Sequence, residues 1–373
     1  MKILMTADTV GGIWTYAMEL ARSLARADVQ IALATMGEPL NSEQRQQISE
    51  LPHTILFESE FKLEWMDNPW PEVQSAGEWL LQIAKDFSPD VVHLNNYSHA
   101  QLPWSVPKIV VAHSCVYSWW LAVWGTFPPE ESYAKYREHV TAGLASADVV
   151  VAPTRAMLSN LQNCYGLQTE SVVIPNGRSR GAFKPAITKQ PFICSAGRLW
   201  DDAKNIRQLN RICGELSWPA YAAGNPTHPA RESEFRGEGN CRSLGYLTQA
   251  ETADLLERAA IFCAPAKYEP FGLAILEAAL SGCALVLGDI DSLRELWNGA
   301  ALFVDPNDDR ALTAALQSLI ENPQERFAMA NRAQQRARVF TPERMGKRYR
   351  DLYLSVLKQF ARAFRQGAFA CGL

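Results

Sequence analysis

The chain has 373 residues, of which 47% are apolar and 20% charged, and its formal net charge is −4. These values are typical of a globular protein long enough to form two hydrophobic cores. The chain has no run of 18 or more apolar residues and no signal-peptide pattern at its N-terminus. We therefore expect a cytoplasmic protein rather than a membrane-spanning or secreted one.

The charge is distributed unevenly. Residues 1–175 carry 19 acidic and 10 basic side chains, whereas the remainder carries 21 acidic and 26 basic ones. The second half is therefore the better host for an anionic ligand, and no nucleic-acid partner is expected. Residues 344–365 contain seven basic side chains and one acid, Asp351. Simple packing and a weak peripheral contact with the inner face of a membrane are both interpretations of this segment.

Short apolar runs rich in β-branched residues alternate with helical patterns along the chain, which predicts an α/β protein with parallel sheets. The expected strands are 2–7, 31–35, 53–57, 90–94, 108–113, 148–153, 171–175, 192–197, 218–224, 241–245, 260–265, 283–289 and 301–305. The turn-rich stretch after Pro175 interrupts the series as a linker would. We therefore expect two Rossmann-like, doubly wound domains, an acceptor-side domain at 1–177 and a ligand-binding domain at 178–341, with a cleft between them. A helix at 342–373 is expected to pack back on the first domain.

The eight cysteines are scattered, without a CxxC pair, and several lie in apolar runs. They are interpreted as small core residues in a reducing compartment. Near the first strand, Gly11 and Gly12 lead into a helix. Paired glycines at this turn let the backbone approach an anion at the helix N-terminus, although such pairs are also common for structural reasons.

Two cations, Arg198 and Lys204, occupy the loop after the strand at 192–197. At the mouth of a βα loop they could bind a pyrophosphate through charge-assisted hydrogen bonds. The alternative is that they neutralise Asp201 and Asp202 on the surface.

Two acids lie eight residues apart across a strand-to-helix junction, Glu269 in the loop and Glu277 inside the helix. Between them, Gly272 and Leu273 offer backbone N–H groups at the helix start. A glycosidase pair would place both carboxylates on one sugar. Because an anion-binding helix start separates them here, the acids more naturally hold the sugar and the ribose of one nucleotide sugar.

The ordered motifs resemble those of family 4 of the retaining glycosyltransferases, which have the GT-B fold. They are GG at 11–12, SADVVVAPT at 146–154, VIPNG at 173–177, AGR at 196–198 followed by KN, LGYL at 244–247, Glu269-x7-Glu277 and SGCALV at 281–286. The similarity covers nearly the whole chain in the right order.

The resemblance implies a role for each matching residue. Arg198 and Lys204 would bind the donor diphosphate and stabilise it as it leaves, Glu269 would hold the donor sugar, and His113 would lie near the reacting sugar. The remaining donor contacts would come from Gly11, Gly12, Gly245, Tyr246, Leu247, Phe271, Gly272, Leu273 and Glu277. The resemblance also implies retention of anomeric configuration, no cofactor and no metal, with a UDP-sugar as donor and GDP- or ADP-sugars as alternatives.

Some features of the chain do not follow from the family pattern. Asp289-Ile-Asp291 spells a DxD motif but is interpreted as a chance match rather than a metal site. His93 and His99 are interpreted as a core histidine and a loop histidine.

An aromatic segment follows His113, with Tyr117, Trp119, Trp120, Trp124 and Phe127. It suits a carbohydrate acceptor, a lipid-linked acceptor or plain core packing. A sugar-nucleotide epimerase and a noncatalytic nucleotide-sugar or glycan-binding protein remain the alternatives to a transferase.

Overall fold

The computed structural model describes residues 1–181, 183–227 and 235–370, and side-chain surroundings up to residue 363. It divides into two compact units. The first comprises Met1–Ser118, Phe127–Gly177 and Pro342–Leu373, of which residues 371–373 lie outside the described part. The second comprises Trp119–Thr126 and Arg178–Thr341.

The first unit is built on a seven-stranded parallel sheet in the order β3-β2-β1-β4-β5-β6-β7. Its strands are β1 (Lys2–Asp8), β2 (Gln30–Met36), β3 (Thr54–Glu58), β4 (Val91–Leu94), β5 (Lys108–Val111), β6 (Val149–Ala152) and β7 (Ser171–Val173). Strand β1 pairs with β2 from Lys2–Gln30 to Asp8–Met36. Because β1 also pairs with β4, the strand order reverses between β1 and β4.

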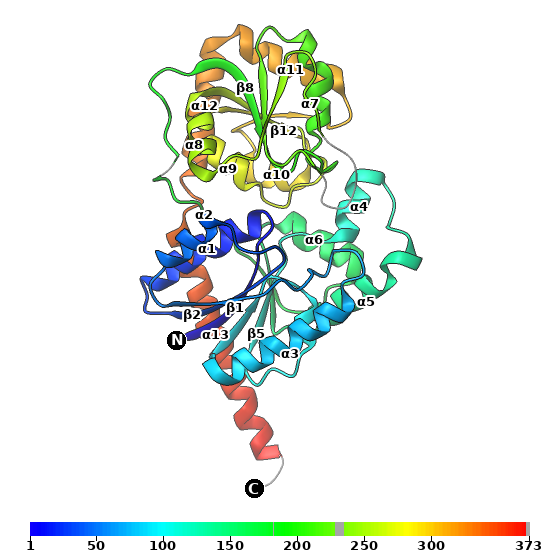
Figure 1. The fold of residues 1–373 in the computed structure, drawn as a ribbon, viewed down its shortest axis with the longest axis vertical. Helices are drawn as coiled ribbons and strands as arrows, with labels where there is room; N and C mark the ends of the chain where they lie inside the picture. The colour runs from blue at the N-terminus through cyan, green and yellow to red at the C-terminus, as the bar shows by residue number, and fades with distance from the viewer. Residues whose placement is uncertain (182, 228–234, 371–373) are drawn as a thin grey trace. The chain divides into compact units, whose positions relative to one another are not determined.

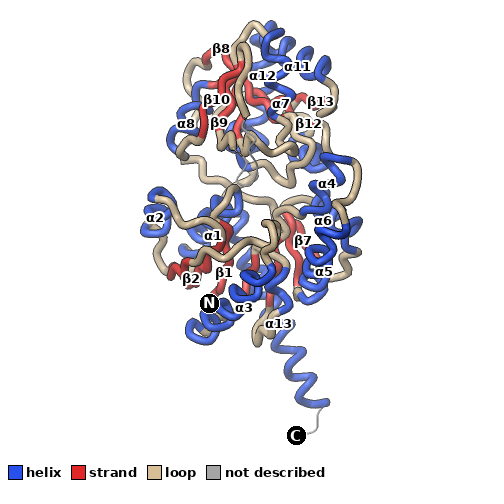
Figure 2. Tube along the Cα trace, turned by 45° about the vertical axis from the view of Figure 1, so that its right-hand side comes forward, coloured by secondary structure: helices blue, strands red, loops and turns tan. Residues whose placement is uncertain are grey.

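Helices cover both faces of this sheet, as Figures 1 and 2 show. They are α1 (Gly12–Ala25), α2 (Ser42–Ser49), α3 (Trp70–Phe87), the 3₁₀ turn η1 (Ser98–Gln101), α5 (Glu130–Ser146), α6 (Arg155–Tyr165) and α13 (Pro342–Ala370). Helix α4 (Val116–Trp124) begins in this unit, and its residues from Trp119 onward belong to the second unit. Their ends follow local chemistry: Asn41 and Gln44 form a capping box on α2, and Gly166 ends α6 in the left-handed conformation.

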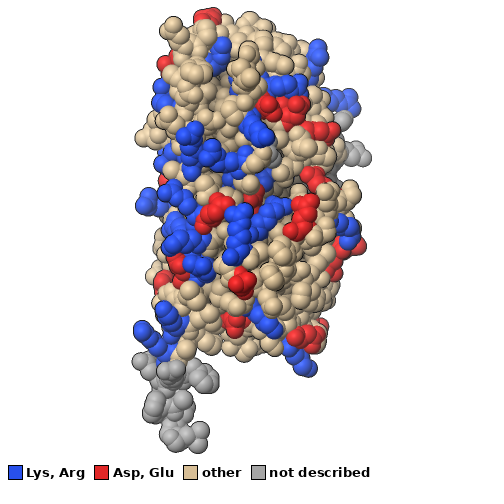
Figure 3. All heavy atoms as spheres, turned by 90° about the vertical axis from the view of Figure 1, so that its left-hand side faces the viewer, with Lys and Arg blue, Asp and Glu red and all other residues tan. Residues whose placement is uncertain are grey.

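The C-terminal helix α13 packs on the same face of the first sheet as α1 (Figure 1). Met345, Tyr349, Tyr353 and Val356, spaced three or four residues apart, are buried in one core with β1 and α1. The opposite face is exposed and carries the basic residues Arg344, Lys347, Arg348, Arg350, Lys358 and Arg362. Figure 3 shows many exposed Lys and Arg side chains on one face of the molecule.

The second unit has a six-stranded parallel sheet in the order β10-β9-β8-β11-β12-β13. Its strands are β8 (Gln190–Ala196), β9 (Ala220–Ala223), β10 (Cys241–Gly245), β11 (Ala259–Ala264), β12 (Ala284–Gly288) and β13 (Leu302–Val304). Its helices are α7 (Ile206–Ile212), η2 (Cys213–Glu215), α8 (Gln249–Arg258), α9 (Leu273–Leu280), α10 (Asp291–Trp297), α11 (Asp309–Glu321) and α12 (Pro323–Ala337).

Two hydrophobic clusters lie on opposite faces of the second sheet. One contains Leu256 of α8, Leu276 of α9 and Ala333 of α12. The other contains Leu209 of α7 and Leu312 of α11. Helix α8 begins with a capping box: the Thr248 side chain accepts a hydrogen bond from the backbone N–H of Glu251, and the Glu251 carboxylate accepts one from the backbone N–H of Thr248. The two doubly wound parallel sheets confirm the predicted fold class.

The seven cysteines that the structure describes are buried free thiols, as predicted, and Cys371 lies outside the described residues. Among the helices in the described part of the chain, none is both long and apolar enough to cross a bilayer.

Candidate active site

The predicted cationic and acidic residues of the second unit follow two neighbouring strands, β8 and β11. The chain runs outward from β8 through β9 to β10 and then returns to the other side of β8 with β11, so the strand order reverses between β8 and β11. Such a reversal splays the loops at the carboxyl edge of a parallel sheet and is where open α/β sheets bind ligands. Arg198 and Lys204 lie in the loop after β8, and Glu269 lies in the loop after β11.

An ion pair joins these two loops. Lys204 Nζ donates to Glu269 Oε2 at 2.5 Å, and the two side chains are 22% and 16% exposed. The structure thus brings together two residues that the sequence assigned to different parts of one ligand. Each is partly buried and charged, so their local dielectric strengthens interactions with a bound anion or hydroxyl group.

Arg198 forms a second ion pair within the loop after β8. Its Nη2 lies 2.7 Å from Asp201 Oδ2. The Asp201 side chain is 2% exposed and that of Arg198 is 41% exposed, so the acid of this pair is buried and the cation lies at the surface. Asp201 Oδ1 also accepts from Trp119 Nε1 at 3.0 Å and from the backbone N–H of Ala203 at 3.0 Å. Burial raises the pKa of Asp201, but Arg198, Lys204 and Trp119 outweigh burial and hold it below its usual value. Asp202 lies 3.8 Å from Arg207 instead.

Helix α9 begins between the two predicted acids. Gly272, its N-cap residue, has φ 84°, and a Cβ there would lie 2.7 Å from Ile275 Cδ1, so glycine is required. In the described structure no side chain caps α9, which leaves its first N–H groups, starting at Leu273, for a ligand. Phe271 is buried, with its ring 5.6 Å from that of Phe340.

Glu277 lies farther along α9 and has a partner that the sequence did not indicate. Arg178 Nε donates to Glu277 Oε1 at 2.7 Å, and the side chains are only 4% and 12% exposed. The two residues are 99 positions apart. The only sequence signal for Arg178 was a basic residue directly after the VIPNG motif.

The predicted donor contacts Gly245, Tyr246 and Leu247 lie at the end of β10 and in the loop after it, against the loop after β9. Gly245 has φ 69°, Leu247 is half-buried, and Tyr246 is 64% exposed. The N–H of Gly224 donates to the carbonyl of Gly245 at 2.7 Å. A Cβ on Gly224 would lie 1.7 Å from the carbonyl oxygen of Gly197, which follows β8. The loops after β8 and β9 therefore pack too closely for any side chain at Gly224.

The predicted glycines of the first unit lie where its strand order reverses. Gly11 has φ 92° and is the N-cap of α1, whose first residue is Gly12, and both glycines are exposed. No side chain caps α1 in the part of the chain that the structure describes. This geometry leaves backbone N–H groups accessible at the end of β1.

His113 follows β5 and is held by Asn95, which follows β4. Asn95 Nδ2 donates to the carbonyl of Thr6 at 2.6 Å, so its Oδ1 is the acceptor for His113 Nε2 at 2.8 Å. Burial, with a smaller effect from His93, lowers the pKa of His113 to about 3. At neutral pH the ring is therefore uncharged, with its proton on Nε2.

The DxD sequence, the aromatic segment and the two further histidines are not among the predicted site residues. Asp289 accepts two hydrogen bonds from Arg294, both at 2.6 Å. Within residues 1–181, 183–227 and 235–370, no group of three His, Cys, Asp or Glu side chains could hold a metal ion. In the aromatic segment, Tyr117 is buried, whereas Trp124 and Phe127 are 54% and 49% exposed. His93 is fully buried in β4, as its interpretation as a core histidine predicts. His99, interpreted as a loop histidine, instead lies in η1 and is 5% exposed.

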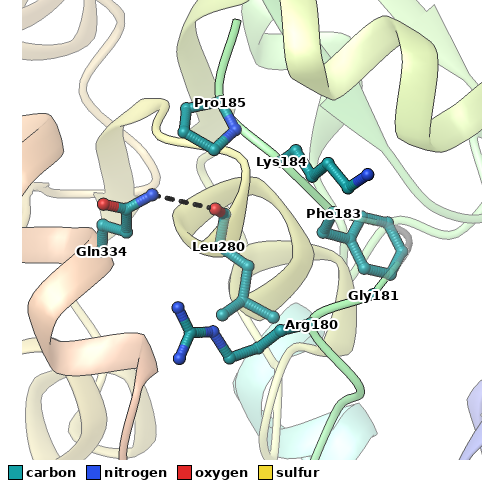
Figure 4. Close-up of a pocket in the computed structure, with 7 residues that line it drawn as sticks. All are labelled: Arg180, Gly181, Phe183, Lys184, Pro185, Leu280 and Gln334. Carbon is teal, nitrogen blue, oxygen red and sulfur yellow. Dashed lines mark hydrogen bonds between the residues drawn. The ribbon is translucent and has the colours of Figure 1, made fainter.

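A cavity of about 350 Å³ lies elsewhere in the second unit (Figure 4). It is lined by Arg180, Gly181, Phe183, Lys184, Pro185, Leu280 and Gln334. The lining that the structure describes includes none of the predicted site residues. Leu280 ends α9, so the cavity lies about 10 Å along this helix from Leu273, at a rise of about 1.5 Å per residue.

Comparison with curated proteins gives partial sequence matches. The chain is 39% identical over 143 residues to O-antigen chain mannosyltransferase B of Escherichia coli, which is 38% of this chain and 32% of that protein. It is 34% identical over 129 residues to glycogen synthase of Mycobacterium tuberculosis, which is 30% of this chain and 31% of that one. The chain thus covers about a third of the length of these two relatives. D-inositol 3-phosphate glycosyltransferase of Kineococcus radiotolerans matches over 88% of this chain and 87% of its own length at 26% identity.

Solved structures match over the whole fold at low identity. Sucrose-phosphate synthase from Thermosynechococcus elongatus has a TM-score of 0.77 at 16% identity, with full coverage of both chains. Anabaena HepE in complex with UDP-glucose has a TM-score of 0.71 at 16% identity and covers 98% of this chain and 100% of its own.

Two family models match consecutive stretches of the sequence. The model described as Glycosyltransferase Family 4 matches residues 10–179, and the model described as Glycosyl transferases group 1 matches residues 182–336. Together they account for most of the chain, in the order that its motifs predicted. The chain therefore belongs to the group 1 glycosyltransferases with the GT-B fold, and the resemblance to family 4 is confirmed.

Proposed function

We propose that this protein is a retaining glycosyltransferase that moves a sugar from a UDP-sugar to a carbohydrate, lipid-linked or small-molecule acceptor. The observation that carries the proposal is the ion pair between Lys204 and Glu269 at the strand reversal of the second unit, beside the uncapped start of α9. The cations and the helix N-terminus suit the diphosphate, and the carboxylates of Glu269 and Glu277 suit the sugar and the ribose.

The ion pairs define how a donor would be received. Arg198 and Lys204 are paired with Asp201 and Glu269 in the structure. A diphosphate offers these cations a doubly charged partner, and its binding would release the carboxylate of Glu269 to accept hydrogen bonds from sugar hydroxyls. As the glycosidic bond breaks, both cations would stabilise the departing diphosphate. In the first unit, His113 is neutral and would act as a hydrogen-bonding group rather than as a charge.

The proposal includes same-face attack without an enzymic nucleophile and chemistry that needs no metal. It is supported by the pairing of both acids, since Glu269 and Glu277 each hold a cation rather than flanking one sugar as a glycosidase pair would. The bidentate contact of Asp289 with Arg294 supports the interpretation of the DxD sequence as a chance match. UDP is proposed as the nucleotide because HepE, a neighbour in fold, is in complex with UDP-glucose.

A ligand screen tests the donor. UDP, GDP and ADP and their common sugars are added to the purified chain, and the donor should raise the melting temperature by mass action. The protein is then incubated with that donor, whose sugar is radiolabelled, in the presence and in the absence of acceptors. A transferase moves the labelled sugar to the acceptor and releases nucleoside diphosphate as the second product only when an acceptor is present. NMR of the glycosylated acceptor reports whether the anomeric configuration is retained. Sugar interconversion without any acceptor would instead identify an epimerase, and binding without turnover under every acceptor would identify a noncatalytic protein.

A weak contact with an anionic bilayer is also proposed, through the exposed basic face of α13. Lys347, Arg348, Lys358 and Arg362 are exposed there, although Lys347 is paired with Asp351. Basic residues near an anionic surface contribute about 1 kcal/mol each at physiological salt. The chain should sediment with vesicles containing 30% phosphatidylserine at low salt, and less so with Arg348, Lys358 and Arg362 changed to Gln. Equal sedimentation with neutral phosphatidylcholine vesicles would exclude this electrostatic contact.

A further inference from the structure

Arg178 is a basic residue whose side chain is almost completely buried. It is 4% exposed and its Nε donates to Glu277 Oε1 at 2.7 Å. Its guanidinium carbon lies 4.8 Å from the ring centre of Phe183, which also lines the cavity in Figure 4. Its backbone N–H donates to the carbonyl of Phe340 at 3.1 Å. Backbone, ring and carboxylate together fix the guanidinium in one place.

This pair differs from an ordinary surface ion pair of the same unit. Arg211 and Asp309 also form a close pair, but their side chains are 55% and 41% exposed. Exposed pairs are screened by water and contribute little. A buried carboxylate that loses its cation instead keeps a desolvated charge, which it can relieve only by turning toward water or by taking a proton. The orientation of Glu277 therefore depends on Arg178.

The charges of the site suggest why Glu277 has a cation of its own. Three carboxylates belong to the predicted donor site, and each is held by a cation: Glu269 by Lys204, Asp201 by Arg198 and Glu277 by Arg178. A diphosphate would draw Lys204 and Arg198 to itself. A ribose hydroxyl is neutral and does not compete for a guanidinium, and a carboxylate can accept about four hydrogen bonds. Glu277 can therefore keep its ion pair with Arg178 while it accepts hydrogen bonds from the ribose hydroxyls.

We infer that Arg178 is a positioning residue that holds Glu277 in the orientation and charge state needed to bind the ribose of the donor. The inference rests on the proposed function and assigns to it a residue outside the family motifs quoted above. It states that Arg178 acts through Glu277 on the recognition of ribose and not on the departing diphosphate. Its loss should therefore change donor affinity and ribose selectivity more than turnover.

The test measures selectivity for ribose hydroxyls by titration calorimetry of the full chain. UDP, GDP and ADP are compared with their 2′-deoxy and 3′-deoxy counterparts. In the unsubstituted protein, the nucleotide that binds should lose about 10- to 100-fold in affinity when the hydroxyl held by Glu277 is absent. In Arg178→Leu, affinity for the ribonucleotide should fall by a similar factor and the preference over the deoxy form should nearly vanish. The KM for the donor should rise in parallel, with kcat within about threefold.

Two further variants separate positioning from packing. Arg326→Leu is the matched control, since the Arg326 guanidinium lies 4.8 Å from the Trp218 ring in the same unit and bonds to the carbonyl of Leu319 rather than to a carboxylate. It should keep full selectivity. Arg178→Lys keeps the charge and should retain part of the selectivity. It also tests the inference if Arg178→Leu does not fold.

The outcomes distinguish this inference from the proposed function. Equal loss of affinity for ribose and deoxyribose forms in Arg178→Leu, with selectivity kept, would show that Arg178 is merely structural. A large fall in kcat with selectivity kept would place Arg178 on the diphosphate and also overturn the inference. If none of the three nucleotides binds the unsubstituted protein, the proposed function fails, and the inference fails with it.

Discussion

Replacing Lys204 with methionine is expected to lower kcat by a factor of about 10² to 10³, which is the usual effect of losing one preorganised donor to a developing negative charge. Methionine keeps the unbranched stem, which packs against Gly197. Glu269, 16% exposed, loses its partner, so the free energy of unfolding should fall by about 1–3 kcal/mol, which leaves the protein folded at 25 °C. Release of nucleoside diphosphate at saturating donor measures the effect.

Replacing Glu269, the carboxylate partner of Lys204, in the same chain gives a more specific version of this experiment. If Lys204 serves only to neutralise Glu269, then the double variant Lys204→Met/Glu269→Gln should recover turnover relative to Lys204→Met. If Lys204 contacts the departing diphosphate, as proposed, the double variant stays at least as slow as the single one. Arg258→Met, which removes an exposed ion pair with Asp254 on α8, is the control and should leave kcat unchanged. Near-normal turnover of Lys204→Met would remove Lys204 from the catalytic machinery.

Acidification is expected to destabilise the first unit because of His93, which is fully buried in β4. Its Nε2 lies 3.2 Å from Tyr16 Oη and its Nδ1 lies 2.7 Å from Tyr353 Oη of α13. Burial lowers the pKa of His93 to about 3, against 6.5 for an ordinary histidine. Between these pH values the unfolded chain binds a proton that the folded chain does not. The stability that His93 contributes is therefore complete above pH 6.5 and is lost as the pH falls toward 3, at up to about 1.4 kcal/mol per pH unit.

The effect is measured as the urea midpoint of the first unit at several pH values between 4.5 and 7.5. Pulse labelling of thiols reports on each unit separately, because Cys115 and Cys164 are buried in the first unit and Cys194 and Cys263 in the second. His93→Gln should lower the midpoint at pH 7.5 but flatten its dependence on pH below 6.5. Replacement of the exposed His53 by Gln is the control for removing a histidine. An unchanged slope in His93→Gln would mean that His93 binds protons equally in the folded and the unfolded chain.

The strands and the fold class could be predicted from the sequence because they depend on local patterns. All thirteen strands of the two sheets lie within or beside the predicted apolar runs, and the start of α9 at Leu273, with Gly272 before it, agrees with the expected helix start. Glycine at a positive φ and a capping box such as Thr248 with Glu251 act within a few residues. The motifs also sufficed to identify the family, which the family models confirm.

The pairing of charges could not be predicted in the same way. Lys204 and Glu269 meet because β8 and β11 are neighbours in a sheet whose strand order differs from chain order. Arg178 reaches Glu277 across 99 residues, and a periodic pattern carries no signal at such a separation. The sequence left open whether Arg198 pairs with an acid on the surface. The structure shows that its partner, Asp201, is buried.

By itself, the sequence determined which residue types line the carboxyl edge of each sheet, because strand ends, glycines and charged loop residues are properties of short segments. Only the tertiary structure decided which cation each acid holds and how deeply each pair is buried. Those properties depend on strand order and on side-chain packing between segments far apart in the chain. Burial in turn sets how strongly two charges interact and how far the pKa of a group such as His93 is shifted.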